Sequence, residues 1–442
     1  MNRKLKFLLI NPTAPEWRVK GAGRPDDSTK PFRFSMLSSL YVAAAMPHYV
    51  ETKIVDEDIE QIDFNTDADL VGISFMTFNA PRAYEIADRF RAAGKKVIVG
   101  GYHPTFMPEE AALHSDAVCV GEAEANVPKM MEDFVGGEMS GIYRHELPDL
   151  KGLPVPDRSL VRRNFYVRAD TAQATRGCPN ACRFCSITAF FKHRFRTRPV
   201  DEVIEELSGL GRYIMFMDDS IVYDREYATE LFSRMVPLRK RWFSQCTVDI
   251  ANDDRLLELA HESGCGGLFV GLESLSQDSL RTLGKNFNRA SDYRKSVAAL
   301  HRAGIAVFAG IVFGNDYDTP DVFKNTVEFL LKANVDALQA TIMTPFPGTP
   351  LHDELKKQGR ITCTDWARYN FGNVVFEPKN MSAGALKRGH DWVLSQFYSR
   401  SSIARRFYRE LGYMALPVMA HGTIPLNLGY RVRLAKVAGL RD

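Results

Sequence analysis

Short apolar runs alternate with amphipathic stretches through the first 140 residues of the chain. Apolar runs bounded by turn residues predict buried strands, and apolar positions spaced three and four residues apart predict helices. The predicted strands cover residues 6–11, 52–55, 70–74, 96–101 and 117–120. The predicted helices cover residues 37–46, 80–93 and 126–134. Because strands alternate with helices, the pattern predicts an α/β fold with a doubly wound parallel sheet.

A second series of strands and helices begins near residue 171. Its predicted strands cover residues 172–175, 213–217, 245–248, 267–271, 306–313 and 337–341. Six such units are typical of an open or partial (β/α)6 barrel, whose loops at the carboxyl ends of the strands carry the chemistry. After about residue 360 the pattern becomes helical and basic.

The stretch between the two series has little periodicity and contains Pro148, Pro154 and Pro156, which is typical of a linker. The sequence therefore predicts four segments. They are an N-terminal sheet domain (residues 1–140), a linker (141–170), a partial barrel (171–360) and a mostly helical, basic C-terminal region (361–442).

Ligands of doubly wound sheets bind at the carboxyl ends of the strands. In the N-terminal series these ends are polar or rich in glycine. They lie at residues 11–12, 74–79, 100–104 and 121–124. The parallel arrangement places all four segments on one edge, which is a candidate ligand site.

The charge distribution is uneven although the formal net charge is only +3. Residues 381–442 hold ten lysines and arginines against three acids, so this tail carries +7 and the rest of the chain −4. A basic tail is expected either to contact an anionic membrane surface or acidic substrate, or to form a solvated helical face. Its aromatic and apolar stretch at residues 407–418 predicts membrane contact, a cap over an apolar pocket, or ordinary packing on the barrel.

Seven cysteines are too few and too unevenly spread for a disulfide framework. The apolar run at residues 7–10 is too short for a signal peptide, and no segment has the roughly 20 apolar residues needed to span a bilayer. We therefore expect a reducing, cytoplasmic location.

Three of the cysteines, Cys178, Cys182 and Cys185, form a CxxxCxxC motif within residues 175–188. Three thiolates on one loop suit three corners of a [4Fe–4S] cluster and leave the fourth iron open for a ligand. The alternatives are a structural zinc site and a chance arrangement. A structural zinc usually needs a second pair of Cys or His ligands, and no such pair follows.

This motif, placed directly after the first barrel strand, resembles that of the radical S-adenosylmethionine (SAM) superfamily. The resemblance implies that the open iron chelates the amino and carboxylate groups of SAM. It also implies that acids at strand ends hold the SAM ammonium, although an acid at such a position can instead cap the next helix. The SAM-binding residues implied in this way are Phe184, Asp218, Asp219, Gln245, Asp249, Glu273 and Ser274. Cys246 is also expected at the barrel mouth.

The N-terminal domain resembles the cobalamin-binding domain that is fused to one class of radical SAM enzymes. The resemblance rests on residues 99–105, 108–111 and 120–124, where adjacent glycines let the backbone approach a bulky ligand closely. The cobalamin-binding residues that it implies are Ser74, Thr77, Phe78, Asn79, Gly100, Gly101, His103, Pro104, Gly121, Glu122 and Glu124.

One motif of cobalamin proteins, Asp-x-His-x-x-Gly, whose His ligates the lower face of cobalt, is missing from this chain. Residues 75–80 offer no strong cobalt ligand, and His103 lies on a different loop, where we expect it to shape the site. The lower face of cobalt is therefore expected to be empty or covered by a side chain that does not ligate it.

The two resemblances together imply a cobalamin-dependent radical SAM enzyme. Such an enzyme methylates an unactivated carbon of a small molecule by means of a 5′-deoxyadenosyl radical and methylcobalamin. The apolar tail favours a lipid, terpenoid or tetrapyrrole substrate. An external electron donor such as flavodoxin or ferredoxin is expected as a partner.

The same residues also bear on other possible functions. The same cofactors also serve non-methylating reactions such as anaerobic oxidative cyclisation or ring rearrangement. A methylthiotransferase would need three N-terminal cysteines, and this chain has only Cys119 there. The basic run at residues 192–198 suits an anionic substrate or a solvated loop, but it is too short to predict nucleic-acid binding.

Overall fold

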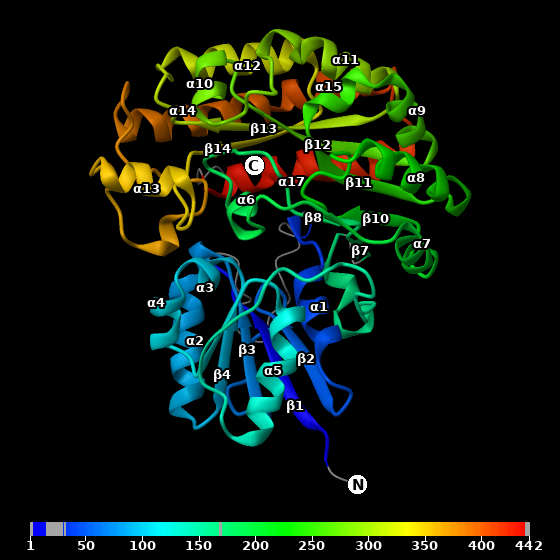
Figure 1. Cartoon of the computed structure of the whole chain (residues 1–442). Helices are drawn as coiled ribbons and strands as arrows, with labels where there is room; N and C mark the ends of the chain where they lie inside the picture. The colour runs from blue at the N-terminus through cyan, green and yellow to red at the C-terminus, as the bar shows by residue number, and fades with distance from the viewer. Residues whose placement is uncertain (1–2, 15–29, 31, 168–169, 438–442) are drawn as a thin grey trace.

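The computed structural model describes the chain apart from residues 1–2, 15–29, 31, 168–169 and 438–442. Two parallel sheets with helices packed on them lie one above the other in Figure 1, the N-terminal sheet below. The C-terminal helix α17 (Ile424–Val437) lies between the second sheet and the N-terminal domain in this view.

The first sheet has six parallel strands in the order β2-β1-β3-β4-β5-β6. They are β1 (Leu5–Asn11), β2 (Val50–Asp56), β3 (Leu70–Ser74), β4 (Lys96–Gly100), β5 (Ala117–Val120) and β6 (Gly141–Arg144). The helices are α1 (Leu37–Ala45), α2 (Ala80–Ala92), α3 (Tyr102–Phe106), α4 (Pro108–Leu113) and α5 (Ala123–Gly136). Because strand side chains alternate between faces, Phe7 packs with α1 and α5 while Leu8 packs with α2. The prediction of a doubly wound parallel sheet is confirmed.

The sixth strand, β6, corrects the predicted start of the linker. It pairs in parallel with β5 from Ala117↔Gly141 to Val120↔Arg144, so the linker cannot begin at residue 141. The sequence did not reveal this strand because it lies at the sheet edge with mostly exposed side chains and lacks an apolar run.

The second sheet is also parallel, in the order β14-β13-β12-β11-β10-β7. Its strands are β7 (Thr171–Ala172), β10 (Tyr213–Phe216), β11 (Arg241–Cys246), β12 (Cys265–Glu273), β13 (Ala306–Phe313) and β14 (Ala337–Ile342). The helices of this domain are α6 (Ser186–Phe190), α7 (Val200–Ser208), α8 (Arg225–Met235), α9 (Asp254–Glu262), α10 (Gln277–Thr282), α11 (Tyr293–Arg302), α12 (Asp321–Ala333) and α13 (Pro350–Lys357). This is the predicted partial (β/α)6 barrel.

Two barrel strands differ from their predicted bounds. The predicted strand at 172–175 is split, because β8 (Thr175–Arg176) leaves the barrel sheet and pairs antiparallel with β9 (Arg196–Thr197). The split occurs where the amides of Ala174 and Thr175 donate to the Asp218 carboxylate instead of a neighbouring strand. The strand predicted at 245–248 is β11, which starts at Arg241 and ends at Cys246, since its alternating polar positions hide the apolar run.

The C-terminal region is mostly helical, as predicted. Its longer helices are α14 (Ala383–Phe397), α15 (Arg400–Glu410) and α17. Part of its positive charge is used internally, because the buried guanidinium of Arg406 donates to the Asp336 carbonyl oxygen at 2.6 Å and to Asn427 Oδ1 at 2.8 Å. Within the described part of the chain, no helix combines the length and the apolar character needed to cross a bilayer.

Glu410 joins α15 to the segment that leads into α17. It is fully buried, and its Oε2 accepts a hydrogen bond from Thr423 Oγ1 at 2.6 Å. Burial raises the pKa of the Glu410 carboxyl from 4.5 to about 7, and the charge of Asp336 adds to this effect.

This pKa predicts a pH-dependent stability. Between about pH 4.5 and 7 the folded state keeps a proton on Glu410 that the unfolded state has lost, so the free energy of unfolding falls as pH rises through this window. Replacing Glu410 by Gln should flatten this dependence in urea unfolding measured at about pH 5 and about pH 8. The matched variant Glu328→Gln, at a half-exposed side chain on α12, should keep the wild-type slope.

Candidate active site

Three cysteines lie on the loop that connects β8 and α6. The turn before this loop needs Gly177, whose φ is +87° and where a Cβ would overlap the Arg194 carbonyl oxygen. The Cys185 amide donates to the Cys182 carbonyl oxygen at 3.1 Å and closes a second turn. Phe184, between these two cysteines, packs against the barrel core.

The surroundings of the thiols fit a cluster. Cys182 is buried, Cys178 and Cys185 are half-buried, and ionisation of one raises the pKa of another. Burial raises the pKa of the Cys182 thiol to about 12, against the lowering effect of Lys285. No three His, Cys, Asp or Glu side chains among the described residues are placed to hold one metal ion.

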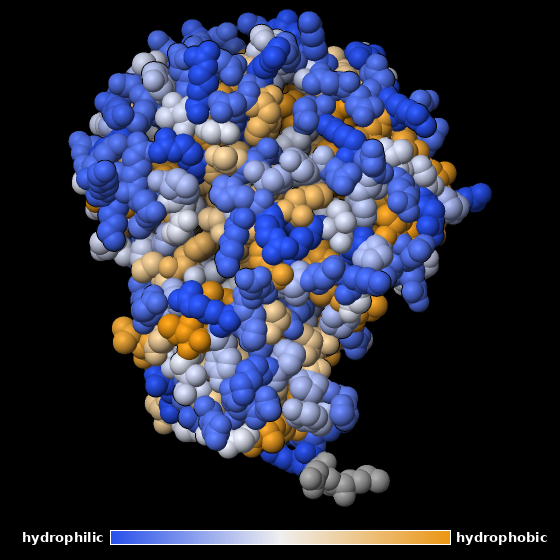
Figure 2. Space-filling view, viewed as in Figure 1, coloured by the Kyte–Doolittle hydropathy of each residue, from blue (hydrophilic) through white to orange (hydrophobic). Residues whose placement is uncertain are grey.

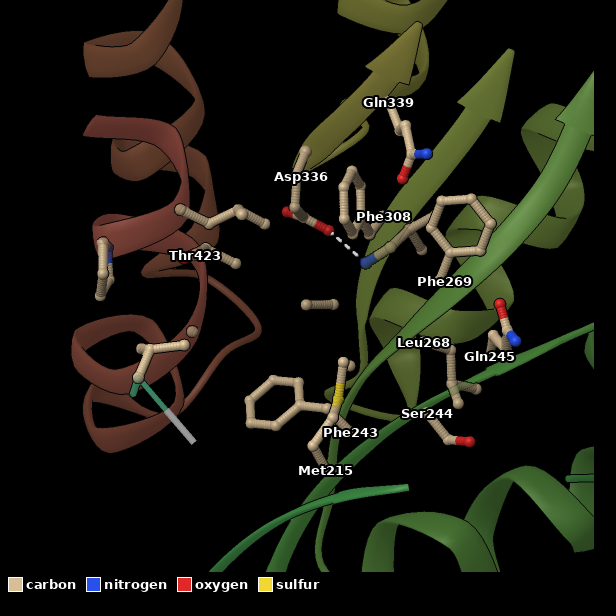
Figure 3. Close-up of a pocket in the computed structure, with 18 of the residues that line it drawn as sticks. Met215, Phe243, Ser244, Gln245, Leu268, Phe269, Phe308, Asp336, Gln339 and Thr423 are labelled. Atoms are coloured by element: carbon tan, nitrogen blue, oxygen red, sulfur yellow. Dashed lines mark hydrogen bonds between the residues drawn. The ribbon is translucent and has the colours of Figure 1, made fainter. Parts of the chain in front are cut away.

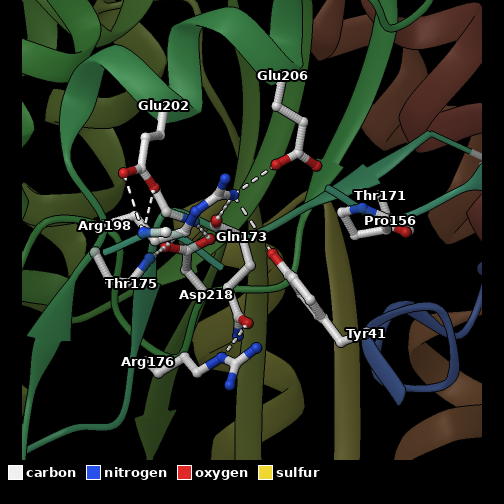
Figure 4. A network of polar contacts seen from close by, with 12 residues as sticks. Tyr41, Pro156, Thr171, Gln173, Thr175, Arg176, Arg198, Glu202, Glu206 and Asp218 are labelled. Carbon is white, nitrogen blue, oxygen red and sulfur yellow. Dashed lines mark hydrogen bonds and ion pairs between the residues drawn. The ribbon is translucent and has the colours of Figure 1, made fainter. Parts of the chain in front are cut away.

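Asp218 lies behind the cysteine loop rather than in the barrel mouth. It is fully buried, and its carboxylate accepts from the amides of Ala174 and Thr175 and from Thr175 Oγ1 at 2.6–3.1 Å. Burial raises its pKa to about 7. These contacts contradict the expectation that Asp218 holds the SAM ammonium, because its acceptors are taken up in fixing β8 (Figure 4).

Asp219 is the acid that reaches the cysteine loop. Its Oδ2 accepts from the Gly177 amide at 2.7 Å, one residue before Cys178. Its second carboxylate oxygen has no hydrogen bond within the described part of the chain. Burial raises the pKa of Asp219 to about 6. Of the two acids, Asp219 therefore keeps an acceptor for a cationic ligand.

The end of β12 carries a buried ion pair. Glu273, at a φ of +64°, contacts Lys285 Nζ at 2.8 Å, and the electrostatic effect of Lys285 reaches Cys182. Ser274 is used locally, since its Oγ accepts from the Ser276 amide at 3.1 Å. The pair places Glu273 beside the cysteine loop, whereas the hydroxyl of Ser274 closes a turn.

Residues of β11 and the turn after it point in different directions. Gln245 lines the interior of the barrel. Cys246, its neighbour, is buried in the core between sheet and helices, so the expectation that it lies at the barrel mouth was wrong. The pleat of a strand sends successive side chains to opposite faces. Asp249 pairs with Arg225 of α8 at 2.8 Å and is not gathered with the cysteines.

The carboxyl edge of the first sheet is kept free of side chains by glycine. Ser74, Gly100, Gly101 and Gly121 line a cavity of about 60 Å³ together with the apolar side chains of β1 and α5. A Cβ on Gly101, whose φ is +103°, would lie 2.7 Å from the Phe75 carbonyl oxygen. A bare, apolar edge of this kind fits close approach by a bulky ligand such as cobalamin.

The loop after β3 lies against the end of β1. Thr77, Phe78 and Asn79 form one helical turn, and Asn79 Nδ2 donates to the Pro12 carbonyl oxygen at 2.7 Å. The two loops predicted to share an edge are thus in contact.

His103 and Pro104 are buried in α3. His103 Nε2 lies 3.2 Å from Glu110 Oε1, and its Nδ1 has no partner in the described part of the chain. Glu110 also accepts from Trp366 Nε1, which belongs to the C-terminal region, at 3.0 Å. His103 is therefore enclosed where two parts of the chain meet, and this agrees with a shaping role.

Glu122 and Glu124 bind arginines of the barrel domain. Glu122 accepts from Arg176 and from Arg196, the latter at 2.7 Å, and Glu124 accepts from Arg176 Nη2 at 2.7 Å. Arg176 also lies over the Tyr41 ring, 4.7 Å from its centroid (Figure 4). Both carboxylate oxygens of Glu122 and one of Glu124 are therefore engaged in joining the domains, and a role of the two acids toward cobalamin stays a prediction.

Sequence reasoning missed three residues of this site, Arg176, Arg196 and Lys285. Their charges meet their partners only after folding. The one available signal was the position of Arg176 directly before the Gly-Cys turn.

Comparison with known proteins assigns the two domains. A family model described as B12 binding domain matches residues 35–130, and one described as Radical SAM superfamily matches residues 173–330. The chain is 32% identical to the bacteriochlorophyllide d C-12(1)-methyltransferase of Chlorobaculum tepidum over 91% of this chain and 89% of that enzyme. The chain belongs to the cobalamin-dependent radical SAM methyltransferases. The cofactors of this methyltransferase are a [4Fe–4S] cluster, SAM and cobalamin.

Two further proteins resemble this methyltransferase. It is 27% identical to the hopanoid C-2 methylase of Rhodopseudomonas palustris over 74% of this chain and 65% of that protein. Its fold matches the solved structure of the radical SAM methyltransferase TsrM from Kitasatospora setae, which has cobalamin and a [4Fe-4S] cluster bound. The TM-score is 0.70 at 16% identity, covering 98% of this chain and 100% of that chain.

The cysteine loop predicts a selective loss of iron. In Cys182→Ala one corner of the cluster lacks its thiolate, so iron and sulfide content after anaerobic purification should fall to a small fraction of the wild-type value. Cys363→Ala, at a half-buried cysteine outside the loop, should keep the wild-type content and the cluster absorption spectrum. Equal iron content in the two variants would contradict the assignment.

The domain contact predicts a large effect on stability. Glu122→Ala leaves the Arg176 and Arg196 guanidinium groups buried without their shared carboxylate, which should lower the free energy of unfolding by about 3–5 kcal/mol. Urea unfolding of the purified protein checks this value. The control Glu132→Ala, at an exposed side chain of α5, the helix that begins directly after Glu122, should change it by less than about 0.5 kcal/mol.

Proposed function

We propose that this methyltransferase transfers a methyl group from SAM, by way of cobalamin, to an unactivated carbon of a tetrapyrrole. The observation that carries the proposal is the meeting of a cysteine loop and a glycine-lined sheet edge at one domain interface. Arg176, two residues before the first cysteine, binds Glu122 and Glu124 of the other domain. This contact keeps the two cofactor sites close to each other.

The choice of substrate rests on the relatives. Two enzymes of Chlorobaculum tepidum that methylate bacteriochlorophyllide d, at C-12(1) and C-8(2), are 32% and 28% identical to this chain over 91% and 80% of its length. A flat, largely apolar acceptor also agrees with the apolar inner face of the barrel.

The residues of this chain bind and orient the cofactors and shield them from water. Bound SAM, cluster and cobalamin supply the radical and methyl-carrier chemistry. Asp219 fixes the Gly177 turn and offers an acceptor for the SAM ammonium. Tyr102 of α3 packs on Phe190 of α6 with ring centroids 4.7 Å apart, and Phe106 lies beside them. These aromatic rings exclude water from the interface near the cysteine loop.

A second candidate is oxidative ring closure on a tetrapyrrole. An anaerobic magnesium-protoporphyrin IX monomethyl ester cyclase of Cereibacter sphaeroides is 23% identical over 84% of this chain. This enzyme is a more distant relative than the methyltransferases, so methylation is the primary proposal.

The test is an anaerobic assay of the reconstituted enzyme with SAM carrying a deuterated methyl group. Bacteriochlorophyllide d, magnesium-protoporphyrin IX monomethyl ester and a hopanoid are offered separately, and products are analysed by mass spectrometry. A labelled methyl group on a tetrapyrrole carbon supports the proposal. A cyclised product without label supports the second candidate. Methylation of a hopanoid but of neither tetrapyrrole would overturn the substrate assignment. Cys182→Ala serves as the inactive control in every assay.

A further inference from the structure

An apolar cavity of about 460 Å³ lies between the inner face of strands β10–β14 and the C-terminal segment 421–430 (Figure 3). Its volume falls within the ~300–1,000 Å³ of small-molecule sites. Met215, Phe243, Phe269 and Phe308 form much of its wall. The cavity is separate from the glycine-lined cavity of the first sheet.

The register of the strands explains why space remains here. Phe243 pairs with Gly267, and Phe308 pairs with Ala337, so large and small residues alternate around the inner face. Barrel interiors of this type are usually filled by side chains. Here the small residues leave room, and the C-terminal segment around Thr423 closes the end of the space.

The polar side chains in the wall are the amides of Gln245 and Gln339, the hydroxyls of Thr423 and Tyr430, the imidazole of His421 and the carboxylate of Asp336. The side chains of Gln245 and Gln339, on the cavity face of β11 and β14, make no hydrogen bond to any described residue. Such groups match a carbonyl or hydroxyl on a ligand, because a buried amide needs a hydrogen-bond partner.

Among its described residues, the wall holds one side chain that can carry a positive charge, His421, and one carboxylate. No lysine or arginine belongs to it within the described part of the chain. Its one carboxylate, Asp336, accepts from the Val307 amide at 2.7 Å, from Tyr413 OH, and lies 2.9 Å from His301 Nε2. A carboxylate placed in this cavity would lose its water and would meet no lysine or arginine in the described wall.

Two glycines, over which Phe269 and the Glu273–Lys285 pair lie, separate the cavity from the cysteine loop. Gly271 and Gly310 pair in register just beyond Phe269 and Phe308 along β12 and β13. A Cβ on Gly271 would lie 2.8 Å from Lys285 Nζ, and the charge of Lys285 acts on Cys182. The cavity is therefore one step along the strands from the proposed reaction site.

We propose that this cavity binds an uncharged hydrocarbon part of the methyl acceptor, with Gln245 and Gln339 as hydrogen-bond partners for a neutral oxygen on it. The inference rests on the proposed function and adds the chemistry by which the acceptor is selected. Charged substituents of the acceptor stay outside the barrel, and its apolar part enters.

The experiment uses two fluorescent probes that differ by one sulfonate. Neutral N-phenyl-1-naphthylamine should bind the anaerobically purified holoenzyme at least about tenfold more tightly than anionic 8-anilino-1-naphthalenesulfonate. Gln339→Glu, which places a charge in the wall, and Ala337→Phe, which fills the space, should each weaken the neutral probe about tenfold or more. Gln396→Glu, at an exposed glutamine of α14, should bind as the wild type does. Iron content and circular dichroism establish that each variant is folded.

The outcomes separate this inference from the proposed function. Unchanged probe affinity in both folded cavity variants, or equal affinity for the two probes, would overturn the cavity assignment even if tetrapyrrole methylation is observed. Selective probe binding that both variants abolish supports the cavity, even where no tetrapyrrole is methylated and the proposed substrate fails. Displacement of the neutral probe by the tetrapyrrole that the enzyme methylates supports both the cavity assignment and the proposed function.

Discussion

The buried guanidinium of Arg176 is the contact on which the arrangement of this protein depends. A buried arginine is costly unless its hydrogen bonds are satisfied, and here the partners Glu122 and Glu124 belong to the other domain. Because Arg176 immediately precedes the Gly177 turn, the same short segment sets the position of the cysteine loop and contacts the other domain. Arg196, which shares Glu122, extends the contact to β9.

Around this contact, the two sheets present different groups at the carboxyl ends of their strands. The carboxyl ends of the first sheet present glycines to a large ligand, and those of the barrel present the cysteine loop with Asp219 and Lys285. The inner face of the barrel holds the apolar cavity, which the C-terminal segment closes. The basic tail thus serves in part as a structural cap, since Arg406 is buried against the carbonyl oxygen of Asp336.

Acids at strand ends show where sequence reasoning reached its limit. Asp218 and Asp219 are adjacent and look alike in sequence, yet one fixes β8 and the other reaches the cysteine loop. Glu122 likewise looks like a ligand-binding acid but pairs with arginines more than fifty residues away. Such choices depend on partners that are distant in the chain, and no local pattern carries that information.

The sequence by itself determined the properties that depend on neighbouring residues. The alternation of apolar runs and amphipathic stretches predicted both parallel sheets, and β3 and β13 have their predicted bounds. A local pattern is enough for this, because the apolar residues that each element buries are its own. The spacing of the cysteines determined the cluster chemistry, because one loop supplies all three thiols. Only the tertiary structure decided which acids bind arginines, that β6 joins the first sheet, and that the barrel stays hollow under the C-terminal helix. These features depend on desolvation and packing between segments that meet only in the folded chain.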